Sequence, residues 1–564
     1  MLHRREMIPL MFLIAGVVAL PGAGATAQDG SPGSGNVSDD VVLRAMIAEL
    51  DRSMKELVLG GLERPYFIQY VVEDTVAHNA SAKFGGVLSS GRTHRRTLNT
   101  DVRVGSYELD DGNLGFGGFS GGVLPLDDDE QAIRHAIWLA TDADYKVSVE
   151  LLTRKRAALK EMNVEDRPND FSPAPPVQVL DPRVTLEVDG AAWTENIRRL
   201  SARFLDHPHV DDAQVTFFAG HTNRTLVNSE GTRYRHGDTG IFVNVSASAR
   251  AADGMDLAAE RMYIAEAFDQ LPSLETMLAD LDALAADLKD RAAAGTLEHY
   301  VGPVLFDAEA AGVVLNDLLA DALAAKPVIL GSRSAQDDTM EKKIGLRILP
   351  RFLSIVDDPN EHFFEGTLLA GHGAYDDEAV RAQRVSLVEN GILKTLVTCR
   401  TPSRKFKESN GHGQGRFGTV NAHVANLFVE TSEGLTQEEL EAELLQAARD
   451  EGLEFALHVR AIESGGGGAL GDPLRVDKVY VADGRRERIR GVEFTTVDIA
   501  KLKDILAAGT QRKVYNDLGF GAGTCSVVCP ALLFEELELT RVEPQFDRLP
   551  ILKPPSLRTA KTVP

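Results

Sequence analysis

Polar residues interrupt one apolar helical segment in a pattern that suits metal chemistry. The stretch YVGPVLFDAEAAGVVLNDLLADALAA, residues 300–325, starts with a strand-like run, continues at helical spacing and carries Asn316, Asp317 and Asp321. Residues four apart lie on one face of a helix, so Asp317 and Asp321 would project to the same side. The spacing suits either a hard cation such as Ca²⁺ or Mg²⁺, or the solvated face of an amphipathic helix.

Two glycine-flanked histidines are further candidates for metal binding or general-base chemistry. His372 lies in AGHGAYDDE, just before Asp376, Asp377 and Glu378, and His412 lies in NGHGQGRFG. Imidazoles with nearby carboxylates form a donor set that Zn²⁺ and similar ions accept. The competing interpretation, which we favour from sequence, is a Gly-His-Gly turn with an exposed imidazole.

Two loops have unusual compositions. SGGGGALGDP, residues 464–473, lacks the Lys-Ser/Thr pair and the helix start of a phosphate loop, so we interpret it as a flexible connection or a lid over a site. The most basic stretch is VTCRTPSRKFKESNGHGQGR, which we expect to be a solvated loop, with the grip of an acidic partner or a peptide carboxylate as the alternative. Its cations are Arg400, Arg404, Lys405, Lys407 and Arg416.

The N-terminus predicts export. MLHRRE is a short basic region, MIPLMFLIAGVVAL an apolar core, and Ala25-x-Ala27 a cleavage site before Gln28. We therefore predict a signal peptide over residues 1–27, a linker over 28–40, and a periplasmic or secreted protein. A membrane anchor is the alternative, but the apolar run is shorter than the roughly 20 residues of a span. No later segment is apolar enough to cross a membrane.

Composition narrows the choice of partners. The chain has 84 acidic and 60 basic side chains and a formal charge of -24, so it should repel nucleic acid unless it carries a dense basic patch.

Its cysteines are Cys399, Cys525 and Cys529. Three cysteines cannot form a disulfide framework in a protein of this size. A Cys525–Cys529 disulfide is one option; three small buried apolar side chains is the interpretation that we favour.

Periodicity predicts an α+β fold in two halves. The N-terminal half, residues 41–300, alternates helical segments (41–59, 129–162, 191–207 and 273–293) with antiparallel strand runs. The C-terminal half, residues 301–564, is β-rich and should enclose a cleft with the first half. TQEELEAELLQAARDEG interrupts its strands as a helix with Thr436 and Glu439 as a capping box, and VENGILK and VADGRRE predict hairpins. The helix after Phe306 should therefore pack against strands.

An ordered set of segments resembles the TldD/PmbA family, a group that includes zinc-dependent peptidases and metal-free relatives. These segments are RTLNTDVRVGSYELDD, VNSEGTRYR, YVGPVLFDAEAAGVVL, DDEAVRAQRVSLVENGILKTLVTCRTPSRKFKESNG, VYVADGRRERIRGVEF and SVVCPALLFEELELTR. Peptidase members carry H-E-x-x-x-H after the GPVL strand, and a cysteine in C-G-K-x-G-Q completes the zinc site. The resemblance places Asn316 and Asp321 at the two histidines and Asp317 at the glutamate.

The resemblance thus implies a member whose zinc-ligand histidines are missing. Asn is a poor zinc ligand, the cysteine context is absent, and Cys525 lies instead in GAGTCSVVCPALL. We expect no catalytic residues, no bound metal and no other cofactor, and a role as a non-catalytic peptide-binding protein or partner subunit in a homo- or hetero-dimer. The alternatives are an active metallopeptidase that binds zinc through Asp317, Asp321 and a histidine such as His372, and a purely structural or interaction protein.

Overall fold

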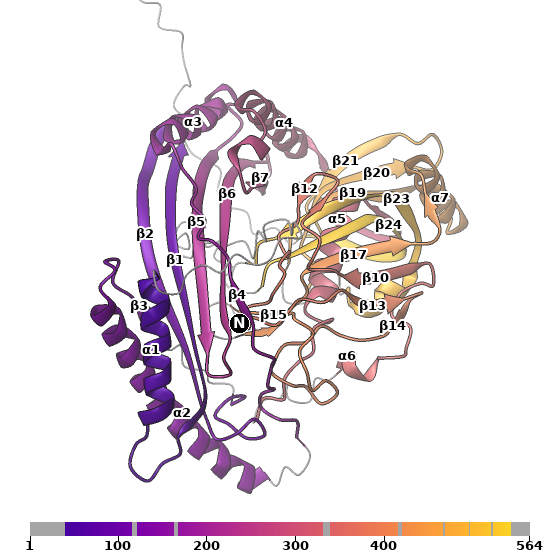
Figure 1. The fold of residues 1–564 in the computed structure, drawn as a ribbon. Coiled ribbons are helices and arrows are strands. Elements are labelled where there is room, and N and C mark those ends of the chain that lie inside the picture. Colours follow the sequence, from indigo (N-terminus) through magenta and orange to yellow (C-terminus); the bar gives the residue numbers. More distant parts are fainter. Residues whose placement is uncertain are drawn as a thin grey trace, which may run out of the picture.

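The computed structural model describes residues 40–114, 121–162, 167–330, 339–415, 420–465, 469–495, 497–519 and 523–542. The predicted signal peptide and most of the predicted linker lie outside these residues. The described chain has the predicted α+β class, with one sheet built from strands before residue 266 and a second built from strands after residue 294 (Figure 1). No helix of the described residues is long and apolar enough to cross a membrane.

Long antiparallel hairpins form the first sheet. Its order is β3-β2-β1-β5-β6-β4, and β7 also pairs with β6. Sequence patterning predicts several short strands here, whereas the structure has two long strands, β1 and β2, in one hairpin. The hairpin turns at Phe84-Gly85, where both residues have positive φ. The strands are β1 (Pro65–Lys83), β2 (Gly86–Val104), β3 (Gly121–Val123), β4 (Gln178–Leu180), β5 (Asp212–Asn228), β6 (Arg233–Arg250) and β7 (Asp256–Ala265).

Four helices cover one face of this sheet. Helices α1 (Val41–Glu56) and α2 (Glu130–Met162) lie at one end, and α3 (Gly190–Arg203) and α4 (Leu274–Ala293) at the other (Figure 1). Even-numbered β1 side chains face both pairs: Ile68, Tyr70 and Val72 pack with α1 and α2, and Ala80 and Ala82 with α3 and α4. Since side chains alternate along a strand, the odd-numbered residues of β1 face the other way, away from the helices.

The second sheet is mixed rather than purely antiparallel. Its order is β14-β13-β10-β17-β24-β9-β19-β20-β21-β8, with β22 and β23 also on β24 and β18 on β23. The β17–β24, β9–β19, β8–β21 and β18–β23 pairs are parallel. The strands are β8 (Gly295–Thr296), β9 (His299–Phe306), β10 (Leu353–Asp357), β13 (Val385–Glu389), β14 (Ile392–Leu393), β17 (Asn426–Thr431), β18 (Gly434–Leu435), β19 (Phe455–Ile462), β20 (Pro473–Tyr480), β21 (Arg486–Arg490), β22 (Val492–Phe494), β23 (Ile505–Asp517) and β24 (Cys525–Arg541).

Helix α5 (Ala308–Leu315) packs on this sheet, as predicted from sequence, and continues into a π-helical turn over Asn316–Ala320. A Cβ on Gly312 would lie 2.9 Å from the Tyr515 Cβ, so glycine permits the close approach of α5 to β23. On another part of the sheet, α7 (Gln437–Asp450) starts with the predicted capping box of Thr436 and Glu439. Two short helical segments also occur in this half: α6 (Thr339–Lys342) and a six-residue 3₁₀ helix, Ile499–Asp504.

Two short ribbons lie between the halves: β11 (Phe363–Phe364) with β12 (Thr367–Leu368), and β15 (Gly413–Gln414) with β16 (Asn421–Ala422). The predicted hairpins form as well. Asn390 and Gly391 both have positive φ, as the predicted Asn-Gly turn between β13 and β14 requires. Strands β20 and β21 are joined through Asp483-Gly484, where only the glycine has positive φ.

Candidate functional site

A cavity of about 670 Å³ lies between the two halves of the chain. Its floor is the face of the first sheet that the helices leave uncovered, and its roof consists of loops from the C-terminal half. Floor residues alternate along the strands: Gln69, Val71, Glu73 and Thr75 on β1, and Arg95, Thr97, Asn99, Asp101 and Arg103 on β2. The roof comes from residues 371–378, 411–415 and 523–524.

Cross-strand neighbours arrange charge on the floor. Glu73 pairs in register with Arg224 of β5, and Thr75 pairs with Thr222. The Arg224 guanidinium lies 3.6 Å from the Glu73 carboxylate and also binds the carboxylate and main-chain carbonyl of Asp377 from the roof. This ion pair joins the two halves across the cavity. Of the three DDE residues, Asp377 is the one that contacts the floor.

The other two DDE carboxylates are buried in the roof. Asp376 accepts hydrogen bonds from the amides of Gly413 and Val380, each at 2.8 Å, and Glu378 accepts one from the Arg400 amide at 2.7 Å. Burial, and then the Glu378 charge, raise the pKa of Asp376, and burial raises the pKa of Glu378 to about 7. Since two close buried carboxylates resist double ionisation, this pair retains a proton near neutral pH.

Arg400 links the two halves of the chain beside the cavity, and its position contradicts the expectation of a solvated basic loop. Its side chain is 1% exposed; Nε and Nη2 donate to the Ser172 carbonyl at 2.9 and 2.8 Å, and Nη2 also reaches Glu230 at 2.7 Å. The guanidinium lies 4.2 Å from the centre of the Phe171 ring. By contrast, Arg404, Lys405 and Lys407 are exposed, and Arg416 lies outside the described residues.

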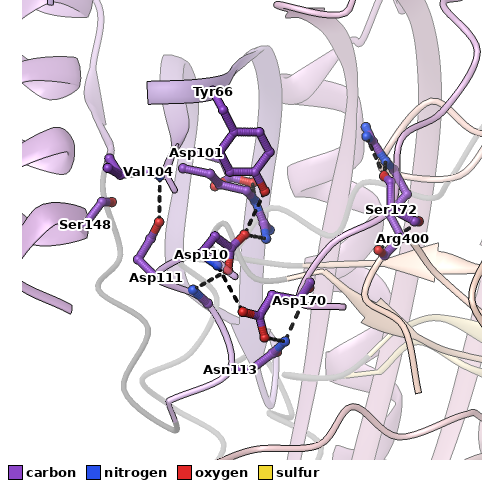
Figure 2. Close-up of polar contacts among 12 residues, drawn as sticks. Tyr66, Asp101, Val104, Asp110, Asp111, Asn113, Ser148, Asp170, Ser172 and Arg400 are labelled. Atoms are coloured by element: carbon purple, nitrogen blue, oxygen red, sulfur yellow. Dashed lines mark hydrogen bonds and ion pairs between the residues drawn. The ribbon is translucent and has the colours of Figure 1, made fainter. Parts of the chain in front are cut away.

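A polar cluster holds the floor residue Arg103 in place. Figure 2 shows three of its members, Tyr66, Asp110 and Asp170. Asp110 accepts hydrogen bonds from the Tyr66 hydroxyl at 2.8 Å and from Arg103 at 3.1 Å, and its amide donates to Asp170 at 2.9 Å. Lys155 forms an ion pair with Asp170 at 2.7 Å. Asp170 and Ser172 lie in the Pro-rich segment 167–177 that precedes β4, which we call the crossover. The crossover is thereby fixed both to the end of β2 and, through Arg400, to the C-terminal half.

His372 and His412 are buried, so the expectation of exposed Gly-His-Gly imidazoles is wrong for both. His372 lines the cavity and contacts His362 and Glu266 rather than the DDE carboxylates, and burial lowers its pKa. His412 bonds through Nδ1 to the Asn410 side chain at 3.0 Å. Its Nε2 lies 3.6 Å from Asp357, whose carboxylate already accepts two main-chain amides.

The helix that resembles a zinc helix ends in a closed hydrogen-bond network. We call residues 308–321 the candidate metal helix. The Asn316 amide donates to Asp517 at 3.0 Å and accepts from the Cys525 thiol at 3.1 Å. The Asp317 carboxylate accepts from the Ser464 hydroxyl and the Gly465 amide, both at 2.9 Å. The glycine-rich loop, interpreted from sequence as a flexible connection or a lid, thus starts with two residues that bond to this helix. Residues 466–468 of the loop lie outside the described part.

Asp321 points elsewhere, and the idea of a solvated Asp317–Asp321 pair is wrong. Asp317 is 4% exposed, whereas the Asp321 side chain is 74% exposed and forms an ion pair with Lys326. The π-helical turn between them shifts the side-chain register of an ordinary α-helix. Asp317, Asp321 and His372 also do not form a ligand cluster, which the alternative of a metallopeptidase with these ligands requires.

The two aspartates should therefore respond differently to substitution. We expect Asp317→Ala to lower the free energy of unfolding by about 1–3 kcal/mol, because it leaves the Ser464 hydroxyl and Gly465 amide without their acceptor. Asp321→Ala should change it by less than about 0.5 kcal/mol, as expected for an exposed ion pair. Urea denaturation of both variants measures the difference; equal losses would contradict this assignment.

Zinc does not fit the donor set of the candidate metal helix. The site offers one amide whose oxygen and nitrogen both have partners, one carboxylate bonded to a hydroxyl and a main-chain amide, and one thiol. Burial, and then Asp517, raise the pKa of Cys525 well above its usual range, so the thiolate that zinc prefers is disfavoured. We therefore derive no chemical step from a metal on this helix.

The three cysteines are free and buried, as favoured from sequence. Cys525 and Cys529 lie on the same strand, β24, where residues four apart are separated by about 13 Å, well beyond the reach of a disulfide. Burial raises the pKa of Cys399 to about 12. All three thiols are therefore packing side chains at neutral pH.

Sequence reasoning missed several residues that define the site. The sequence patterns did not indicate four residues that line the cavity or contact its lining residues: Arg95, Arg224, His362 and Glu266. The partners of Arg224 and of His362 are distant in the sequence. The polar alternation on β2 was the available signal, but alternation alone is typical of a solvent-facing sheet surface. The structure shows that this polar face is instead the floor of a cavity.

Fold and site together define a two-sheet α+β protein with a cavity between its two halves. Residues 299–541 match the PmbA/TldA metallopeptidase C-terminal domain. A metalloprotease of Methanocaldococcus jannaschii is 29% identical over 140 residues, which are 24% of this chain and 29% of that protein. A metalloprotease of Methanothermobacter thermautotrophicus is 32% identical over 116 residues, 20% of this chain and 23% of that protein. The matched stretches thus span less than a third of these relatives.

Solved structures extend the likeness in fold to most of the chain. TldE from Thermococcus kodakarensis aligns with a TM-score of 0.57 at 13% identity, covering 88% of this chain and 100% of that one. A candidate modulator of a DNA gyrase from Thermotoga maritima MSB8 aligns with a TM-score of 0.59 at 14% identity, covering 88% and 99%. Residues 299–541 thus carry a C-terminal domain of the TldD/PmbA family, and most of the chain shares the fold of these solved structures.

Proposed function

We propose that this chain is an exported, non-catalytic member of the TldD/PmbA family that binds peptides in the cavity between its two halves. The observation that carries the proposal is the contrast between two places. The polar side chains Asn316 and Asp317 of the candidate metal helix are already hydrogen-bonded within the protein. The cavity of about 670 Å³, in contrast, has a polar floor with charged side chains that a ligand can contact. Its volume is within the range of about 300–1,000 Å³ that is typical of ligand sites.

Arg95 is the residue best placed to bind a peptide carboxylate. It lies on β2, lines the cavity and is exposed, and it forms no ion pair with the carboxylates of the described residues. The other floor arginines, Arg103 and Arg224, are held by Asp110 and Asp377. An arginine without a protein partner can bind a carboxylate in bidentate geometry, which favours a ligand with a free C-terminus.

Peptide titrations test this assignment. The probes are a library of tetrapeptides with free C-termini and the same library amidated, with binding followed by fluorescence anisotropy. Arg95→Gln should weaken binding of the free-acid peptides by about 10-fold or more, since a hydrogen bond to a charged group contributes roughly 1.5–3 kcal/mol. Arg92→Gln is the matched control, because Arg92 is an exposed arginine three residues away on β2, outside the cavity lining.

The expected pattern is a loss in Arg95→Gln that disappears with the amidated library and is absent in Arg92→Gln. No binding by the unmodified protein, or equal losses in both variants, would refute peptide binding through this arginine. The same mixtures analysed by mass spectrometry should contain intact peptides only. Hydrolysis that a chelator abolishes would contradict the non-catalytic role and favour the metallopeptidase alternative.

Export and assembly are separate parts of the proposal. Fractionation of the source cells should recover a mature chain that begins at Gln28, supported by the basic and apolar segments that precede it. A mass in solution of twice the chain, alone or with a related subunit, would support the partner role. A chain that retains residues 1–27 in the soluble cell interior would contradict export.

A further inference from the structure

We propose that Glu266, His362 and His372 bind one divalent transition-metal ion of the Zn²⁺ class at the junction of the two halves. This site is distinct from the candidate metal helix and shares none of its residues. Among the described residues, these three form a group whose ligand atoms all lie within 4.8 Å of one another. The proposal does not depend on peptide binding in the cavity.

The three ligand atoms converge on one point. His362 Nε2 lies 2.8 Å from Glu266 Oε1, and His372 Nε2 lies 3.5 Å from the same oxygen. The imidazole rings stack with centroids 3.9 Å apart and planes inclined by 24°. The two Nε2 atoms thus lie beside the same carboxylate oxygen of Glu266.

His372 supplies an unused lone pair. Its Nδ1 lies 2.6 Å from the Leu369 carbonyl, and since a carbonyl only accepts, Nδ1 carries the proton. Nε2 is then the acceptor nitrogen of a neutral ring. The His372 side chain is only 4% exposed, and its Nε2 atom is buried without a hydrogen-bond partner. A buried acceptor without a donor is costly, and a cation between Nε2 and Glu266 would satisfy it.

The backbone on both sides of the histidines is fixed. His362 immediately precedes β11 and His372 follows β12, and these strands are joined by Glu365 and Gly366, both with positive φ, as in a two-residue type I′ turn. The Leu369 amide donates to the His362 carbonyl at 3.0 Å, which closes the base of the ribbon. The hairpin thus brings both rings to one end before any ion binds.

Glu266 comes from the other half of the chain and is equally well held. It follows β7, its amide donates a hydrogen bond to the Gln270 side-chain oxygen at 2.9 Å, and its carbonyl accepts one from the Thr239 hydroxyl at 2.8 Å. Its side chain is 10% exposed. An ion here would join β7 to the β11–β12 ribbon, and so connect the two sheets.

The donor set selects the class of ion. Two imidazole nitrogens and one carboxylate oxygen suit Zn²⁺ and Co²⁺, whereas Ca²⁺ and Mg²⁺ prefer sets made of oxygen alone. Three protein ligands leave at least one coordination position for water or another ligand. His372 also lines the cavity, so an open position could be reached from there.

Titration of tag-free, chelator-stripped full-length protein with Co²⁺ and Zn²⁺ tests the site. Co²⁺ should bind at one equivalent and give visible absorption bands of a low-coordinate nitrogen–oxygen site, and Zn²⁺ should displace it. Glu266→Gln, His362→Ala and His372→Ala should each weaken Zn²⁺ binding by about 100-fold or more, because losing even a residue that only orients a ligand costs about 10–100-fold. Ca²⁺ and Mg²⁺ should not compete.

A matched control separates a built site from general histidine binding. His207 also lies 2.8 Å from a carboxylate, that of Asp282, and next to a second ring, His209, but His209 Nε2 is bonded to the Ala285 carbonyl. His207→Ala should therefore leave Zn²⁺ affinity unchanged. Asp317→Asn, on the candidate metal helix, should leave it unchanged as well.

Each outcome decides the matter. One equivalent of metal that is lost in the three ligand variants and kept in both controls supports the site. No binding, or binding that survives loss of His362 and Glu266, overturns it, and so does loss only in Asp317→Asn. If His372→Ala does not fold, the more exposed His362 and Glu266 positions carry the test, with circular dichroism showing that those variants are native.

Discussion

Replacement of Arg400 by alanine is expected to lower the free energy of unfolding by about 3–5 kcal/mol, because it removes one partner of a buried ion pair and leaves the other uncompensated. The guanidinium satisfies the Ser172 carbonyl and the Glu230 carboxylate, and it stacks on Phe171. The substitution thus removes a charge and the side-chain hydrogen bonds that Arg400 donates to Ser172 and Glu230. Urea denaturation followed by circular dichroism measures the effect.

Arg404→Ala is the control for this substitution, because Arg404 is an exposed arginine in the same loop. It should change stability by less than about 0.5 kcal/mol. Arg400→Lys should also destabilise the protein, since an ammonium cannot reproduce the planar contacts to Ser172 and Phe171. Equal stability of the Arg400→Ala and Arg404→Ala variants would show that Arg400 does not join the halves.

Local chemistry in the sequence was enough to predict most of the elements. The capping box of Thr436 and Glu439 begins α7 where expected, and Asn390-Gly391 forms its hairpin, because caps and tight turns depend on residues close in sequence. The lengths of β1 and β2 were not predicted. Phe84 adopts positive φ in a turn without the Asn-Gly or Asp-Gly signature, so nothing local indicated one continuous hairpin.

The site was less predictable, because its contacts join distant parts of the chain. Glu266 and His362 are 96 residues apart, and Arg400 and Ser172 are 228 apart. Arg400 looked like one more cation in a basic loop, and only the fold buries it. Likewise, Asp317 and Asp321 differ only because a π-helical turn and the start of a glycine-rich loop enclose one of them.

Gly371→Ala is expected to destabilise the protein by about 1–3 kcal/mol and to weaken metal binding at His372, because overpacking forces the backbone to move. A Cβ at this position would lie 2.1 Å from the Ala425 carbonyl oxygen and 2.8 Å from the Asn426 side chain. The segment would have to shift away from β17, which would break the bonds from the Ala370 amide to Ser526 and from the Gly371 amide to Asn426.

Gly373→Ala is the matched substitution on the other side of the same histidine. Its nearest neighbour would be the Tyr375 carbonyl oxygen at 3.4 Å, an ordinary contact, so stability and Zn²⁺ affinity should be close to those of the unmodified protein. Because both changes add one methyl group next to His372, their difference measures the close approach of Gly371 to Ala425. If Gly371→Ala kept full stability and full Zn²⁺ affinity, the position of His372 would not depend on that contact.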